Sequence, residues 1–199
     1  EVIFMIPSTG KSNDSWGAIK GMYRTDDPAK GDAQWMASND LFEQFAADDK
    51  RGEIFYMTKD GIHYTTKFDY DNMDCIIMGE NELLLIYAEA VNELNGGPDA
   101  EAYNQVNRIR TRAHATPFSG MNQDEFRSAV LEERARELAY EADRRYDLFR
   151  WGIYLDVMNA IDMDEHNVTK RRLERNLLYP IPTSEVNSND KIDSNNPGW

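Results

Sequence analysis

The pattern of apolar and polar positions becomes helical from residue 80 onward. Between Glu80 and Asn95, apolar side chains recur at every third or fourth position, which predicts one amphipathic helix. Asn95-Gly96-Gly97-Pro98 follows, and glycine and then proline in these positions end a helix. The apolar stripe expected on this helix is formed by Leu84, Tyr87, Ala88, Val91 and Leu94.

A second helix is expected directly after this turn. Its apolar face, at positions i, i+4, i+7 and i+11, is formed by Ala102, Val106, Ile109 and Ala113. Because the connection is so short, the second helix should fold back antiparallel to the first. The pair resembles one tetratricopeptide unit, which needs neighbours to bury its outer apolar face. Small side chains are expected at the contact between the two helices, namely Ala88, Ala90 and Ala102.

Two further helices are predicted beyond this pair. Asn122, followed three positions later by Glu125, predicts a capping box at the start of the third helix. Its expected apolar face is Leu131, Ala135, Leu138 and Ala142, and its polar faces carry Glu132, Glu133, Arg134, Arg136 and Glu137. A fourth helix should run from about 143 to 162, with Tyr146, Phe149, Ile153, Val157 and Ile161 on one side. A charged connection up to residue 175 and extended coil with turns complete the chain.

The first 79 residues predict shorter elements separated by long loops. The expected elements are a strand over 1–7, a helix over 39–47 with Asn39 as its N-cap, a hairpin of strands 54–57 and 64–68, and a strand over 76–78. The fold class is therefore mainly α, with tetratricopeptide-like helix pairs and a loop-rich, partly β flank. Residues 1–79 form the loop-rich part, which is the candidate for ligand binding, and 80–199 form the helical part of the same domain. A strand that begins at Glu1 without a preceding signal sequence suggests a fragment of a longer protein.

Composition narrows the classes of ligand. The chain of 199 residues has a formal net charge of −14, and it lacks the basic stripe that a nucleic-acid backbone requires. A neutral or cationic ligand fits this charge better. Cys75 is the only cysteine, so no internal disulfide can form. No apolar run approaches the ~18 residues of a membrane-spanning helix.

Aromatic residues in the loop-rich part are the candidate binding residues. Indole and phenol rings stack on the apolar face of a sugar ring, and neighbouring amides and carboxylates bond its hydroxyl groups. The ligand-binding candidates are Trp16, Tyr23 and Trp35, with Asn13, Asp14 and Asn39 as polar neighbours. The alternative is a structural role, in which these rings cover the core, as Trp151 and Trp199 are expected to do.

Metal and catalytic sites are less well supported by the sequence. His63, His114 and His166 are not at metal-ligand spacing, and we expect no metal site and no cofactor. The run from Asp69 to Asp74 leaves calcium open, although Met73 stands where an oxygen ligand should be. A glycosidase pair could be chosen from Glu141 with Asp143 or Asp147. The nearby arginines favour ion pairs that fix one helix to another, so we predict no catalytic residues and no enzyme.

Several of these motifs, in this order, resemble the C-terminal part of proteins of the SusD/RagB family. The resemblance is carried by residues 83–152, by Leu178-Tyr179-Pro180-Ile181-Pro182, by Asn196-Pro197-Gly198-Trp199, and by Phe45 to Arg51. Two positions depart from the pattern of the family. Ala142 replaces the usual glycine, and Arg145 stands where an aromatic residue is common, which should affect packing more than binding.

The resemblance implies a function in nutrient capture. Such proteins bind oligosaccharides at the outer-membrane surface of Bacteroidetes-type bacteria and deliver them to a TonB-dependent, SusC-like transporter. They carry a lipid anchor on an N-terminal cysteine and earlier helical repeats, both absent from this sequence. Two alternatives stay open, a peptide-binding member of the same family and a helical-repeat module that docks a protein partner without glycan.

Overall fold

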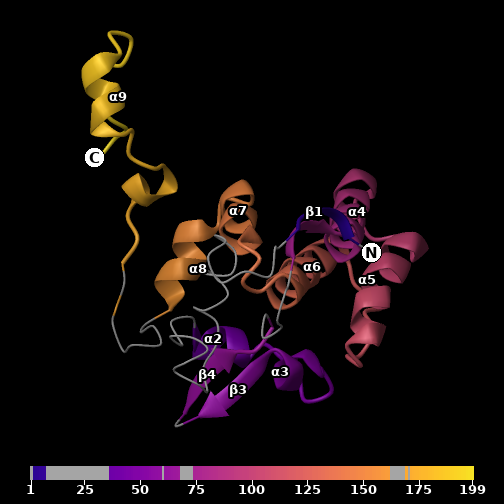
Figure 1. Ribbon diagram of the computed structural model, residues 1–199. Coiled ribbons are helices and arrows are strands. Elements are labelled where there is room, and N and C mark those ends of the chain that lie inside the picture. Colours follow the sequence, from indigo (N-terminus) through magenta and orange to yellow (C-terminus); the bar gives the residue numbers. More distant parts are fainter. Residues whose placement is uncertain (1, 8–35, 60, 68–73, 162–168, 170) are drawn as a thin grey trace. The chain divides into compact units, whose positions relative to one another are not determined.

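In the computed structural model, the chain divides into two compact units, Glu1–Ala142 and Asp143–Trp199 (Figure 1). The residues described are 2–7, 36–59, 61–67, 74–161, 169 and 171–199. The first unit contains two small sheets and three long helices, whereas the second consists of short helices and an extended tail. The expected class, mainly helical with short strands in the N-terminal part, is confirmed.

Helices α4, α5 and α6 form the core of the first unit. They span Glu80–Asn95, Ala100–Arg112 and Gln123–Glu137. Their inner faces are fully or almost fully buried, and the core is formed by Leu85, Ala88, Ala102, Val106, Ile109, Phe126, Val130 and Leu138. Ala88 and Ala102 are both completely buried, so two of the predicted small contact residues lie where the helices pack. The third, Ala90, is exposed.

The ends of these helices follow from their capping residues. Gly96 ends α4 in the left-handed conformation at φ 71°, as the Gly-Gly-Pro sequence predicted. Asp99 caps α5 by accepting a hydrogen bond from the Ala102 amide at 2.8 Å. The predicted capping box of α6 is confirmed, since Asn122 accepts from the Glu125 amide at 3.1 Å while Glu125 accepts from the Asn122 amide at 2.9 Å.

The apolar stripe predicted on α4 is wrong in part. Tyr87 and Leu94 are exposed, and Leu85 and Asn92 take the buried positions on either side of Ala88. The reason is that α4 is apolar on two sides, so its sequence pattern allows more than one inner face. Asn92 is buried because its side-chain amide donates to the Gln123 carbonyl at 3.0 Å and so fastens α4 to the start of α6.

The face predicted on α6 also needs correction. The helix ends at Glu137, with Leu138 as its C-cap, so Ala142 lies beyond it at φ 75°. Phe126 and Val130 supply the apolar contacts of the first turns. Four of the five residues expected on its polar faces, Glu133, Arg134, Arg136 and Glu137, are buried. They are charged residues of the interior and not a solvated surface.

Two small antiparallel sheets precede the helices. In one, β1 (Val2–Ile6) pairs with β5 (Cys75–Gly79), which confirms both predicted strands. In the other, the order is β2 (Met36–Ala37), β4 (Ile62–Thr65) and β3 (Tyr56–Lys59), so the predicted hairpin is present. Its first strand starts later than expected, because Arg51–Ile54 forms the short helix α3.

The helix expected over 39–47 is shorter than predicted and has a different cap. Helix α2 covers Asn39–Phe42, and Ser38, not Asn39, accepts the capping hydrogen bond, from the Leu41 amide at 3.2 Å. Asn39 is the first residue of the helix and is exposed. Serine and asparagine are both good N-caps, so the sequence alone could not separate them.

The second unit begins with two helices where one was predicted. Helix α7 spans Asp143–Arg150 and α8 spans Tyr154–Ala160. Gly152 separates them at φ 70°, and the Ile153 amide reaches back to the Leu148 carbonyl at 3.0 Å, which is the hydrogen bond of a Schellman motif. The tail is also more regular than the extended coil predicted, with a 3₁₀ turn η1 at Glu174–Leu177 and helix α9 at Thr183–Ser188.

Candidate functional site

The predicted ligand-binding residues, apart from the polar neighbour Asn39 on α2, fall within one segment of the first unit. Asn13, Trp16, Tyr23 and Trp35 lie in residues 8–35, outside the described part of the chain, so their assignment stays a prediction. Asp14 lies in the same segment. The structure does describe the elements on either side of it, and these determine where its two ends are attached.

Both ends of this segment continue from paired strands. On one side is β1, in which Ile6 lies opposite Cys75 of β5. On the other side is β2, in which Met36 lies opposite Tyr64 and Ala37 opposite His63 of β4. The strands on both sides of residues 8–35 are therefore fixed by backbone hydrogen bonds.

A cluster of aromatic rings supports the sheet to which this segment returns. Tyr56 is buried at its centre, with ring centroids 5.7 Å from Phe42, 5.5 Å from Phe45 and 6.3 Å from Tyr140. Phe42 also stacks on His63 at 3.6 Å. Burial raises the pKa of the Tyr56 phenol, so this ring stays neutral. Sequence reasoning missed the cluster, because it joins residues from four separate stretches of chain.

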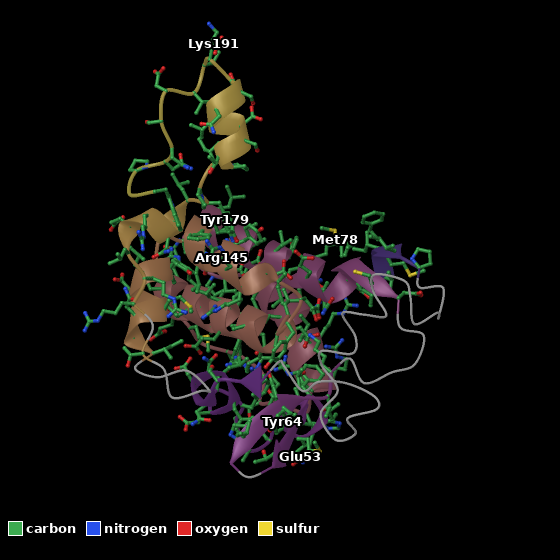
Figure 2. All side chains as sticks on the ribbon, turned by 60° about the vertical axis from the view of Figure 1, so that its left-hand side comes forward. Glu53, Tyr64, Met78, Arg145, Tyr179 and Lys191 are labelled. Atoms are coloured by element: carbon green, nitrogen blue, oxygen red, sulfur yellow. The ribbon has the colours of Figure 1, made fainter. Side chains whose placement is uncertain are left out.

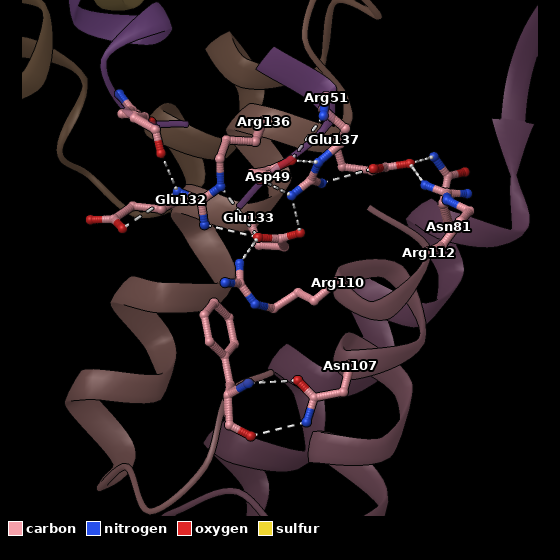
Figure 3. Close-up of polar contacts among 12 residues, drawn as sticks. Asp49, Arg51, Asn81, Asn107, Arg110, Arg112, Glu132, Glu133, Arg136 and Glu137 are labelled. Atoms are coloured by element: carbon pink, nitrogen blue, oxygen red, sulfur yellow. Dashed lines mark hydrogen bonds and ion pairs between the residues drawn. The ribbon is translucent and has the colours of Figure 1, made fainter. Parts of the chain in front are cut away.

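The same unit contains a largely buried group of charges, which we call the charged cluster (Figure 3). It consists of Asp49, Arg51, Arg110, Arg112, Glu133, Arg136 and Glu137, with the amide of Asn81. Its members come from the start of α3 and the residues just before it, from α4, from α5 and from α6. The cluster therefore connects the loop-rich part of the first unit to all three of its long helices.

Arg51 is the centre of the charged cluster. Its guanidinium contacts Asp49 at 2.7 Å, Glu133 at 2.8 Å and Glu137 at 2.9 Å, and only 4% of its side chain is exposed. A guanidinium has five N–H donors in a fixed plane, and so it can serve three carboxylates at once. These contacts raise the pKa of Arg51 against the opposing effect of burial.

The two buried carboxylates of α6 are fully occupied by cations. Glu133, which is completely buried, is also bonded by Arg110 at 2.7 Å and by Arg136 at 2.8 Å. Glu137 accepts from Asn81 at 2.9 Å and pairs with Arg112 as well as with Arg51. Burial by itself would raise the pKa of Glu137, but Arg112 and Arg51 hold it below its ordinary value. Carboxylates held in this way act as structural anchors.

The carboxylates considered as a glycosidase pair are also engaged in ion pairs. Glu141 accepts from the Lys67 ammonium at 2.5 Å, and the same ammonium donates to the carbonyls of Glu137 and Ala139. In the second unit, Asp147 is buried and accepts from Arg150 at 2.9 Å. An arginine therefore engages Asp147 as predicted, but within α7 and not between two helices, while a lysine engages Glu141.

A cavity of about 390 Å³ lies beside the charged cluster, between the β1–β5 sheet and helices α4 and α5. Its apolar lining is Val2, Ile76, Leu84 and Ile109, and its polar lining is Glu80, Asn81, Arg108, Arg112 and Glu141. Each charge in the lining has a partner, because Arg108 pairs with Glu80 at 2.6 Å, Arg112 with Glu137, and Glu141 with Lys67. The cavity therefore favours an uncharged occupant.

In the described residues, no group of three His, Cys, Asp or Glu side chains has the geometry of a metal site. His63 is hydrogen-bonded to Thr58 at 2.8 Å, and burial lowers its pKa, while His114 lies at the end of α5. His166 and the stretch 69–73 considered for calcium lie outside the described residues. No helix of the described chain is both long and apolar enough to cross a bilayer.

The sequence matches known proteins over most of its length. The sequence model of the SusD family matches residues 46–199. SusD-like protein P25 of Formosa agariphila is 38% identical over 125 residues, which is 59% of this chain and 23% of that protein. SusD-like protein P2 of the same organism is 37% identical over 126 residues, which is 59% of this chain and 24% of that protein.

Solved structures share the fold over the whole chain. A SusD superfamily protein from Bacteroides vulgatus superposes with a TM-score of 0.79 at 18% identity, covering 100% of this chain and 51% of that one. Surface glycan-binding protein A from Bacteroides fluxus superposes with a TM-score of 0.74 at 22% identity, over 100% of this chain and 51% of that one. This chain thus spans about half the length of these proteins. With the family model matched from Ala46 to the last residue, the chain belongs to the SusD family.

Proposed function

We propose that this chain is part of a cell-surface glycan-binding protein that captures oligosaccharides without chemical turnover. Its membership of the SusD family is the observation that carries the proposal. Two solved proteins of the same fold are named for such a ligand, surface glycan-binding protein A from Bacteroides fluxus and a SusD-like carbohydrate binding protein from Bacteroides vulgatus. The segment 8–35, with Asn13, Trp16, Tyr23 and Trp35, is the proposed contact region.

The physical features of the first unit are consistent with a neutral ligand. The carboxylates and guanidiniums of the charged cluster are paired with one another, so they do not create a strong local field for a charged ligand. The proposed contact region is anchored at both ends by strand pairing.

The rest of the proposed function concerns delivery. The captured oligosaccharide would pass to a TonB-dependent, SusC-like transporter in the outer membrane, with the protein held at the extracellular face by a lipid anchor. This role rests on the family resemblance, and it requires a ligand that is released intact. Binding without turnover is therefore the property to test first.

Calorimetric titration with a panel of neutral oligosaccharides and peptides tests the proposal. We expect saturable oligosaccharide binding that weakens about tenfold or more in Trp16→Ala or Trp35→Ala, because each variant loses a stacking surface. Tyr146→Ala is the matched control, since this aromatic side chain is 64% exposed on α7 and should not affect affinity. Binding of peptides alone would retain a capture role with another cargo, whereas release of reducing ends from the glycan would contradict the proposal.

A further inference from the structure

The first unit leaves a large apolar surface open on its β1–β5 sheet. Every residue of β1 is exposed, from Met5 at 42% to Phe4 at 58%. Three neighbours on β5 are exposed as well, Ile76 at 48%, Ile77 at 49% and Met78 at 37%. Met78 marks the position of this sheet in Figure 2. Contiguous apolar surface of this kind marks an interaction site.

The backbone hydrogen bonds of this sheet are also not all satisfied by the part of the chain that the structure describes. Within the described residues, β1 and β5 pair only with each other, so each has an outer edge of unpaired backbone groups. The pairing is irregular on both sides of Phe4, which lies opposite Met78. A sheet of only two strands is marginally stable in water by itself. Its stability therefore requires further contacts.

Helix α4, which follows β5 directly in the chain, is also apolar on its exposed side. Opposite its buried stripe it carries a second apolar stripe, at positions i, i+3, i+4 and i+11, formed by Leu83, Ile86, Tyr87 and Leu94. Leu83 is 48% exposed, and Ile86 and Tyr87 are each 41% exposed. A helix that is apolar on both sides is normally covered on both sides. This stripe explains why the predicted inner face of α4 included two exposed residues.

We propose that the β1–β5 sheet and the outer stripe of α4 dock the part of a SusD-family protein that this chain does not span. The solved relatives match the whole of this chain with only 50–54% of their own length, so each contains about as much chain again. A tetratricopeptide-like helix pair buries its outer face against neighbouring helices. We therefore expect the segment that docks here to present an apolar helical surface.

The proposal identifies which residues would be buried. Phe4 and Ile77 lie on the two strands of the sheet, and Leu83 lies on the first turns of α4. The cavity lined by Val2 and Ile76 opens beside them and would receive an apolar side chain of the occupant. A lysine at any of these positions would leave an unpaired charge in the interface, which is costly.

Co-expression provides the test. This chain, with an affinity tag, is produced together with the part of SusD-like protein P25 that lies outside the region equivalent to it. We expect the two polypeptides to co-purify in equal amounts. Phe4→Lys and Ile77→Lys should weaken the complex about tenfold or more. Ile54→Lys is the matched control, because Ile54 is 61% exposed on α3, and this variant should bind as the unchanged chain does.

Three results would overturn the proposal. One is a complex that survives both Phe4→Lys and Ile77→Lys. A second is self-association of this chain, measured by light scattering, that both variants abolish, since the surface would then dock a second copy. The third is the absence of any complex, including failure to recover the second polypeptide in the presence of this chain. Circular dichroism of each lysine variant at the helical bands confirms that the first unit is still folded.

Discussion

Arg51 donates from Nη1 to Oε2 of Glu137 at 2.9 Å, across 86 positions of the chain. Both side chains are 4% exposed, so this ion pair lies in the interior of the first unit. It connects the short helix α3, at the edge of the loop-rich part, to the last turn of α6. The candidate binding part and the helical core are therefore held together by charge as well as by apolar packing.

Replacing Arg51 should destabilise the first unit strongly. Arg51→Met leaves Asp49, Glu133 and Glu137 without their shared cation, and losing one partner of a buried ion pair costs about 3–5 kcal/mol of the free energy of unfolding. Urea unfolding followed by circular dichroism measures the change. Lys50→Met is the matched control, because its pair with Glu53 is exposed and should contribute about 0–1 kcal/mol. Equal effects of the two variants would contradict the assigned role of the cluster.

The same cluster predicts how stability depends on pH. The pKa of Glu137 is lowered in the folded protein, because Arg112 and Arg51 outweigh the effect of burial. A carboxyl group with a depressed folded pKa contributes stability above its unfolded pKa, near 4.5, and this contribution is lost as the pH falls through the folded value.

Urea unfolding between pH 7 and pH 3 provides the measurement. The unchanged chain should lose stability below about pH 4.5, whereas Glu137→Gln, less stable at neutral pH, should lose less over the same interval. Glu53→Gln is the control, since this glutamate lies in an exposed pair and its removal should leave the pH dependence as it is. A pH dependence of the same size in Glu137→Gln would show that other carboxyl groups are responsible.

The sequence predicted those features of the fold that depend on residues close together in the chain. The capping box at Asn122, the glycine stop at Gly96 and the strand at Val2–Ile6 were all predicted correctly, because each depends on neighbouring residues. The inner face of α4 was predicted less well. Two apolar stripes wind around this helix, and only the contacts with α5 and α6 select the one that contains Leu85.

The charged cluster shows the limit of such reasoning. The sequence indicated that arginines and glutamates near residue 135 form ion pairs between helices, and the partners from α5 confirm this. It could not show that Arg51 is the central cation, because no local pattern joins positions 51 and 133. The prediction that Glu133 and Glu137 lie on a polar face failed for the same reason, since burial depends on distant partners.

Ala142 offers a way to stabilise the first unit. It adopts φ 75°, a left-handed conformation that costs a residue with a Cβ roughly 1 kcal/mol relative to glycine. Ala142→Gly should therefore raise the free energy of unfolding by up to about 1 kcal/mol. Gly152→Ala is the reciprocal variant, because Gly152 has φ 70°. This substitution should lower the free energy of unfolding by a similar amount. Destabilisation by Ala142→Gly would mean that the methyl group contributes packing that outweighs the strain.

Arg145 should stabilise the second unit through cation–π contacts with three aromatic rings. Its guanidinium carbon lies 4.5 Å from the ring centre of Phe149, 4.7 Å from Tyr179 and 5.2 Å from Tyr154, and Nη2 donates to the Asn176 carbonyl at 3.1 Å (Figure 2). These contacts join α7 to α8 and to the tail that contains η1. Partly desolvated cation–π contacts contribute about 0.5–2 kcal/mol each, so Arg145 should contribute measurably to the attachment of the tail.

Two substitutions separate the charge of Arg145 from its shape. Arg145→Met keeps the aliphatic length and should release the tail, which limited proteolysis would detect as faster cleavage between residues 169 and 182. Arg145→Tyr places an aromatic ring among the same rings and should recover part of the protection. Arg108→Met is the control, because this side chain is 49% exposed in the first unit and should leave cleavage of the tail unchanged. Unchanged cleavage in Arg145→Met would show that asparagine contacts hold the tail to the helices instead, such as the bond from Asn159 of α8 to the Arg172 carbonyl at 3.0 Å.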